Sequence, residues 1–197
     1  MYELPTSITV NGIQHPIRNQ GDYRMVLDCF TALNDETISK NERIVACLCI
    51  FLEEITDISQ IYELPDLEKV SKEVMKFLNC GSDDNEKQQP FRVIDWEKDE
   101  TLICSAINKI AGKEIRTEPY IHWWTFMGYY VAIGESALAT VVSIRYKKAR
   151  NEKLEKHERK FINDNPQYFN LDMRTIQQRE DDEWIKSVWN KDKKSDE

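Results

Sequence analysis

The longest apolar stretch of the chain constrains its fold most. From Ile121 to Ile144 only Glu135 is charged. A stretch of this length could cross a bilayer, which needs about 20 apolar residues. However, Gly134-Glu135-Ser136 lies near its middle, where a carboxylate in lipid is costly. It divides the stretch into pieces of about 14 and 9 residues, which are the lengths of buried core helices. We therefore expect two packed helices here and no membrane span.

Helical spacing of apolar residues also marks four other segments, namely residues 23–33, 44–52, 67–78 and 102–110. Asp22 is the expected N-cap of the first segment, and Ser39 with Glu42 forms a capping box before the second. A charged helix is expected from Asn151 onward. The chain has only 6 Gly and 6 Pro, which also favours helices over a sandwich rich in tight turns.

One β-hairpin is expected near the N-terminus. Residues 6–10 and 13–17 flank Asn11-Gly12, and Asn-Gly is the preferred two-residue loop because both of its positions need a positive φ. Pro16 lacks an N–H group and therefore lies on an edge or at the end of the second strand. The predicted fold class is mainly α, with helical domains and a small N-terminal β-hairpin.

The chain is expected to divide into two helical lobes. Residues 81–92 are polar and nearly free of apolar side chains, which is typical of a linker. The predicted organisation is a hairpin and helical lobe over residues 1–80, the linker over 81–92, a second lobe over 93–165 and a variable, partly flexible tail over 166–197.

No catalytic, cofactor or metal site is expected. The five cysteines show no CxxC spacing, and we interpret them as reduced core residues. His122 precedes Trp123-Trp124 but has no second His or Cys at ligand spacing, so we interpret it as a histidine bonded at the first turn of a buried helix. Phosphate-binding and nucleophile-elbow motifs are not found in the sequence. We therefore expect a protein that is not an enzyme.

The charge is unevenly distributed along the chain. Residues 1–100 carry 20 acidic and 10 basic groups, and residues 101–197 carry 15 and 17, so the halves have net charges of −10 and +2. Residues 145–160 alone carry eight basic and three acidic groups. A helix of this kind could bind phosphates or an acidic protein surface, or it could simply be solvated and linked by short-range ion pairs. The asymmetry suggests self-association.

Several strings resemble a known bacteriophage family. They are Asp95-Trp96-Glu97-Lys98-Asp99, residues 103–110, the string His122-Trp123-Trp124-Thr125-Phe126, and Val142-Ser143-Ile144-Arg145. Together with Leu4-Pro5, Gly12, Ile17, Asp22-Tyr23-Arg24 and the helix after Ser39, they are similar to the gene-product-fifteen family of phages and prophages of Gram-positive bacteria. The resemblance covers roughly residues 2–165, and the region after Asn165 departs from it.

The resemblance implies a tail-assembly chaperone. Such a protein would bind the tape-measure protein and keep it soluble while the tail tube assembles, in the host cytoplasm and absent from the mature virion. The implied partners are the tape-measure protein, a second tail-assembly chaperone, the major tail protein and further copies of the chain, with no membrane and no nucleic acid. A small helical nucleic-acid-binding regulator and a structural tail or connector component are the alternatives.

The candidate contact residues fall into two sets. The first is aromatic and is expected to line an apolar groove for a partner helix: Tyr23, Phe30, Trp123, Phe126 and Tyr130. The second is basic and is expected to meet an acidic surface: Arg145, Lys147, Lys148, Lys153 and Lys156.

Replacing Lys147, Lys148, Lys153 and Lys156 by Glu is expected to weaken self-association or partner capture, because it reverses the charge of the basic segment. Size-exclusion chromatography and a pull-down measure the two effects. Unchanged elution together with unchanged capture would contradict a contact role for these lysines.

Overall fold

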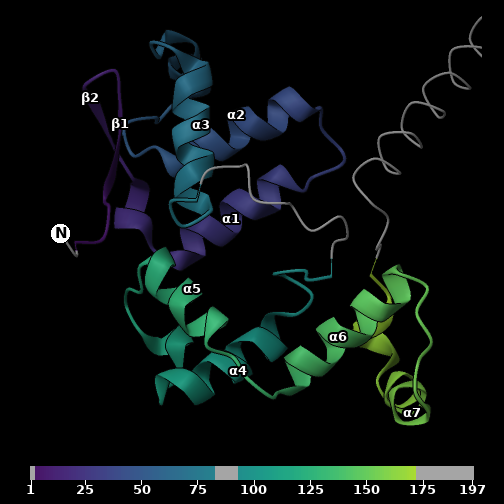
Figure 1. Cartoon of the computed structure of the whole chain (residues 1–197). Coiled ribbons are helices and arrows are strands. Elements are labelled where there is room, and N and C mark those ends of the chain that lie inside the picture. The colour runs from purple at the N-terminus through teal and green to yellow at the C-terminus, as the bar shows by residue number, and fades with distance from the viewer. Residues whose placement is uncertain (1–2, 83–92, 172–197) are drawn as a thin grey trace, which may run out of the picture. The chain divides into compact units, whose positions relative to one another are not determined.

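The computed structural model describes residues 3–82 and 93–171 (Figure 1). The chain forms two compact units. Unit 1 comprises residues 1–87 and 100–134, and unit 2 comprises residues 88–99 and 135–197. The predicted lobe over 93–165 is therefore divided between the units, because its first helices pack with the N-terminal helices. Most of the predicted linker and most of the predicted tail lie outside the described residues.

Unit 1 begins with the predicted hairpin. Strand β1 (Ser7–Val10) pairs antiparallel with β2 (Ile13–Pro16), with Val10 opposite Ile13. Asn11 and Gly12, between the strands, have φ values of 51° and 83°, which are the left-handed conformations that a two-residue loop of this kind requires. The mainly α fold with a small N-terminal hairpin is thus confirmed.

The helices of unit 1 begin where their caps predict. Asp22 accepts a hydrogen bond from the backbone N–H of Arg24 at the start of α1 (Tyr23–Leu33). Ser39 and Glu42 form the predicted capping box of α2 (Lys40–Phe51). These side chains satisfy N–H groups that have no partner within the helix. The two helices pack against each other and bury Val26, Leu48 and Phe51.

A short turn of 3₁₀ helix follows α2 and leads into α3. It is η2 (Ile58–Glu63), and α3 (Leu67–Leu78) has Asp66 as its N-cap. Helix α3 ends in a Schellman motif in which Cys80 takes a φ of 54° and the N–H of Gly81 bonds to the carbonyl of Lys76 at 2.8 Å. Gly81, the next residue, also has a positive φ of 86°, and α3 ends at the last residue of the predicted segment 67–78.

The apolar stretch forms two helices, as predicted from its length and its central Gly-Glu-Ser. Helix α5 (Trp123–Val131) belongs to unit 1 together with α4 (Glu100–Ala111) and the turn η3 (Ile115–Thr117), and α6 (Ala137–Ala149) belongs to unit 2. Within residues 3–82 and 93–171, no helix has the length and apolar character needed to cross a bilayer.

Unit 2 corrects the prediction of one basic helix over residues 145–160. Helix α6 ends at Ala149 and α7 (Lys156–Asp164) starts seven residues later, followed by the turn η4 (Pro166–Phe169). The cause is a second Schellman motif: Asn151 adopts a φ of 55°, and the N–H of Glu152 bonds to the carbonyl of Lys147 at 2.8 Å. Asparagine tolerates this left-handed conformation better than most residues.

His122 caps α5 with its side chain and is buried. Its Nδ1 accepts the backbone N–H of Trp124 at 3.0 Å, so Nε2 carries the proton and donates it to the carbonyl of Pro5 at 3.0 Å. Burial lowers the pKa of His122 below its usual value of 6.5, and the bond to Pro5 opposes this shift. The neutral ring is therefore the form that the fold requires.

We expect His122 to make unit 1 sensitive to acid. Because its pKa is lower in the folded state, the unfolded chain binds an extra proton below about pH 6.5, and the free energy of unfolding falls as the pH decreases through that value. His122→Asn keeps an N-cap acceptor and should reduce this slope. Urea unfolding at several pH values between 5 and 8 measures it; equal slopes for both proteins would contradict the assignment.

Candidate partner-binding surfaces

The predicted aromatic residues come together where α5 packs on α1. The rings of Tyr23 and Phe126 stack with centroids 4.5 Å apart and an interplanar angle of 7°. Trp123 lies 5.7 Å from Phe126 and 5.7 Å from Phe30. Offset stacked and tilted pairs of this kind add to the stability gained by burial. The cluster therefore combines Tyr23 and Phe30 of α1 with Trp123 and Phe126 of α5.

Both indoles also complete the end of α3. Nε1 of Trp123 donates to the carbonyl of Leu78 at 2.9 Å, and Nε1 of Trp124 donates to the carbonyl of Phe77 at 3.0 Å. The last carbonyls of a helix have no partner within it, so these donors satisfy two groups that would otherwise need water. The two tryptophans thus bind α5 to α3 through hydrogen bonds as well as through packing.

Most of the aromatic cluster is interior. Tyr23, Trp123 and Phe126 are 4%, 1% and 1% exposed, which leaves them almost no surface for a partner. Phe30 and Tyr130 are half-buried. The groove expected along these side chains is instead the contact between α1 and α5, since large aromatic rings bury the most area when they pack together.

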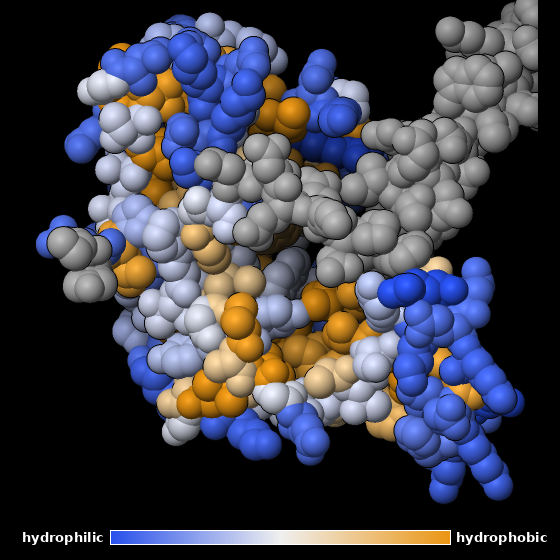
Figure 2. All heavy atoms as spheres, in the orientation of Figure 1, coloured by the Kyte–Doolittle hydropathy of each residue, from blue (hydrophilic) through white to orange (hydrophobic). Residues whose placement is uncertain are grey.

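The outer face of α5 is apolar and uncharged. No charged residue occurs between Pro119 and Gly134. Val131 is 78% exposed, Gly128 and Ala132 are exposed, and Met127 is half-buried. Figure 2 shows hydrophobic residues at the surface in the region where α4 and α5 lie in Figure 1. A helix that is apolar on all sides normally has partners on all sides. This face, rather than the stacked aromatic rings, is the apolar surface that unit 1 offers a partner.

A second exposed apolar pair lies on η2. Ile58 is 59% exposed and Tyr62 is 73% exposed. The sequence gives no periodic signal for these residues, because six residues of 3₁₀ helix are too short for a periodic pattern. The available signal was the acidic composition around them, since residues 44–68 contain six acidic residues and no basic one.

Arg145, one of the predicted basic contacts, is a buried structural residue of unit 2. Its guanidinium is 2% exposed and bonds to both carboxylate oxygens of Asp99, with Nη2 2.8 Å from Oδ1. It also donates to the carbonyl of Val93 at 3.0 Å and to that of Tyr168, with Nε at 2.8 Å. Asp99 in turn accepts the N–H of Asp95 at 3.0 Å. Arg145 therefore connects three segments of the chain and cannot contact a partner.

The four predicted lysines differ in their availability. Lys147 donates to the buried Glu158 at 2.6 Å, and this bond raises the pKa of Lys147 and lowers that of Glu158. Lys148 lies over the ring of Phe169 at 5.9 Å. Lys153 and Lys156 are exposed. Of the four, only the last two are exposed and therefore available to a partner.

An open pocket of about 660 Å³ lies at the start of α1. It is lined by Arg18, Asn19, Asp22, Arg24, Met25, Asp28, Ile50, Pro119 and Tyr120. Arg18 donates to four backbone carbonyls near the end of α2, and Arg24 donates to Asp22 and to carbonyls of residues 115–118. The cations of the pocket are thus largely occupied in holding unit 1 together.

The thiols of the described residues are poor nucleophiles. Burial raises the pKa of Cys49, Cys80 and Cys104, and the neighbouring Cys47 together with burial raises that of Cys29. The thiolate is the reactive form of cysteine. In residues 3–82 and 93–171, no cluster of three His, Cys, Asp or Glu side chains is placed to hold a metal ion.

Comparison with known proteins gives one relationship. The family model described as Bacteriophage Gp15 protein matches residues 1–171, which include all of unit 1 and the described residues of unit 2. The chain therefore belongs to the bacteriophage Gp15 family, in agreement with the resemblance found in its sequence. No curated protein and no solved structure matches the chain.

We expect Arg145→Ala to destabilise unit 2 strongly, by about 3–5 kcal/mol, because removing one partner of a buried ion pair leaves the other charge uncompensated. The matched control is Arg150→Ala, whose partner Glu152 and whose own side chain are exposed. Urea unfolding followed by circular dichroism compares the two variants. Equal losses of stability would contradict the role assigned to Arg145.

Proposed function

We propose that the chain is a non-enzymatic tail-assembly chaperone. In this proposal it binds the tape-measure protein and keeps it soluble while the tail tube assembles around it. It acts in the host cytoplasm, together with a second chaperone and the major tail protein, and is not retained in the mature virion. Membership in a bacteriophage family supports the setting, and the surface of unit 1 supports the mechanism.

The observation that carries the proposal is the uncharged outer face of α5. Its inner face is held by Trp123 and Phe126, so the helix remains folded while Val131 faces solvent. A long helical client with apolar stripes would bind such a face in the helix-in-groove manner. Met127 at the border of this face adds an unbranched side chain that adapts to irregular apolar surfaces.

The net charge of the chain fits this role. The full chain has a net charge of −8, and charge far from zero keeps a protein soluble. A complex with an aggregation-prone client gains the same protection. Apolar capture and charge repulsion therefore act on different surfaces of one chain, and a single substitution can weaken the first without changing the second.

Val131→Asp is expected to reduce the soluble fraction of the tape-measure protein encoded by the same phage when the two are co-expressed, because a carboxylate on the outer face of α5 would be desolvated by an apolar client. Ser105→Asp, on the exposed side of α4, adds the same charge as a control. The measurement is the client in the supernatant after centrifugation.

Three outcomes distinguish the possibilities. Lower client solubility with Val131→Asp and unchanged solubility with the control support the proposal. A client that is equally soluble with and without the chain would rule out the chaperone function. Finding the chain in purified virions at the abundance of a tail subunit would favour a structural component instead.

A further inference from the structure

Unit 1 carries a continuous acidic segment around the exposed pair on η2. Between Arg43 and Lys69 the sequence has no basic residue. We define the acidic surface by six exposed side chains: Glu53, Glu54, Asp57, Glu63, Asp66 and Glu68. Ile58 and Tyr62 are exposed within this segment. An apolar centre with a charged rim is the usual composition of a protein contact surface.

Several of these carboxylates already have structural roles. Asp57 and Asp66 cap η2 and α3, and their pKa values are lowered by hydrogen bonds from Ser59 and Lys69. Asp66 and Glu68 also form ion pairs, with Lys69 at 2.6 Å and with Lys72 at 2.7 Å. Glu54 bonds to the buried His15 at 2.6 Å. Glu53 and Glu63 are exposed and have no bond to another side chain among the contacts of the described residues. The charge of these two can therefore be changed without removing a cap.

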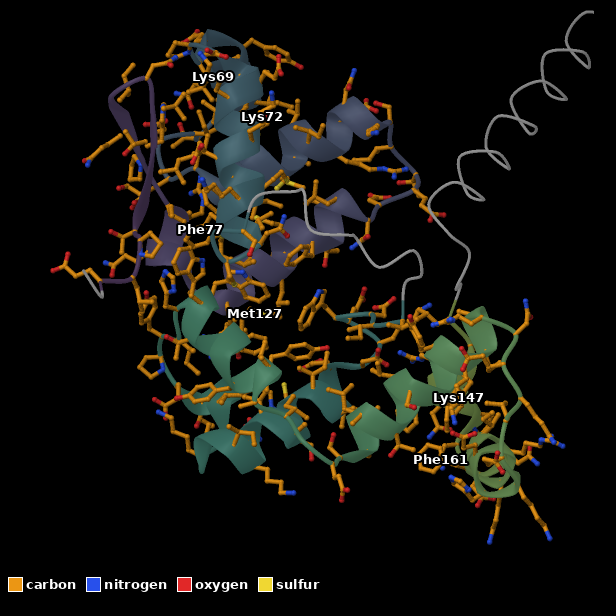
Figure 3. All side chains as sticks on the ribbon, viewed as in Figure 1. Lys69, Lys72, Phe77, Met127, Lys147 and Phe161 are labelled. Atoms are coloured by element: carbon orange, nitrogen blue, oxygen red, sulfur yellow. The ribbon has the colours of Figure 1, made fainter. Side chains whose placement is uncertain are left out.

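Unit 2 carries the complementary charge on and just before α7. We define the basic surface by four exposed side chains: Lys153, Lys156, Arg159 and Lys160. Figure 3 shows long side chains that end in nitrogen extending outward from this part of the unit. Glu158, on the same helix, is buried and neutralised by Lys147. With Glu158 internal, the four exposed cations outnumber the two exposed carboxylates of residues 153–164, which are Glu155 and Asp164.

We propose that the acidic surface of one copy binds the basic surface of a second copy. Opposite charges attract across such a contact, and the exposed ring of Tyr62 can accept a Lys or Arg side chain over its face. Each surface repels a second copy of itself, so every contact joins an acidic surface to a basic one, either reciprocally in a two-fold pair or head-to-tail. A head-to-tail contact produces a ring if the rotation closes and an open series of copies if it does not.

This inference rests on the two surfaces and not on the proposed client. A series of copies would nevertheless suit a chaperone for a long partner, because each added copy offers another outer face of α5. The charge asymmetry of the sequence pointed to self-association, and the structure assigns it to two particular surfaces. The assignment differs from the basic set predicted from sequence, since Arg145, Lys147 and Lys148 are left out and Arg159 and Lys160 are added.

The test is a charge swap between two variants of the full chain. Glu53→Lys with Glu63→Lys makes the acidic surface basic, and Lys156→Glu with Lys160→Glu makes the basic surface acidic. Each variant alone places like charges at the contact, so we expect its self-association to weaken at least tenfold. An equimolar mixture restores opposite charges at every contact, and its association should return toward that of the original chain.

Sedimentation velocity over a range of concentrations measures the association, and circular dichroism verifies that each variant is folded. Glu97→Lys with Glu135→Lys is the matched control for the Glu53→Lys, Glu63→Lys variant. These exposed side chains lie outside both surfaces, and their replacement changes the net charge by the same amount as in that variant. Tyr62→Ser should also weaken association without changing charge. Added salt should weaken association of the original chain, since it screens exposed charges.

Several results would overturn the inference. The first is an original chain that stays monomeric at all concentrations. The second is a pair of variants that associate as the original does, or as the control does. The third is a mixture that fails to restore association, because the two altered surfaces would then not face each other in the contact. If these variants keep the client less soluble but self-associate as the original chain does, the acidic surface binds the client and not a second copy. The inference would then be wrong, and the proposed function would stand.

Discussion

The capped start of α5 is the interaction on which unit 1 depends. At this point the N–H of Tyr23 bonds to the carbonyl of Ile121 at 2.9 Å, and the N–H of Ile121 bonds to Asp22 at 2.9 Å. The ring of His122 reaches Pro5 and lies edge-on to Phe77 at 5.7 Å. Four segments that are distant in sequence therefore meet at one cap. Space is limited there, since a Cβ atom on Gly21 would lie 2.9 Å from the Phe77 ring.

The same cap explains how an apolar helix can remain partly uncovered. The indoles of Trp123 and Trp124 bond to the end of α3, and the Phe126 ring stacks on α1, so the inner face of α5 is held by directed contacts as well as by burial. The contacts of its inner face are enough to keep α5 folded without a partner on its outer face. That face is free for a partner, whereas a helix held only by general burial would lose stability if it were exposed.

Unit 2 is organised by a different interaction, the buried pair of Arg145 and Asp99. A buried ion pair stabilises only when its remaining donors and acceptors are satisfied. Here the guanidinium also bonds to the carbonyls of Val93 and Tyr168, which specifies where the two flanking segments lie. With the cation used internally, the outward charge of the unit comes from α7 and the residues just before it. The two units therefore differ in stabilisation and in surface charge, and this difference underlies the proposed contact between copies.

The sequence by itself determined the elements whose signals are local. The Asn-Gly turn, the N-caps at Asp22 and Ser39, and the division of the apolar stretch at Gly134-Glu135-Ser136 each involve neighbouring residues, so their geometry follows from short-range hydrogen bonds and backbone preference. Even the cap role of His122 could be inferred from its place before Trp123. Tertiary structure alone decided which aromatic rings are interior and that Arg145 is buried against Asp99, 46 residues away. Periodicity shows that a helix has an apolar face, but only packing against distant segments determines which face is covered and which charge remains outside.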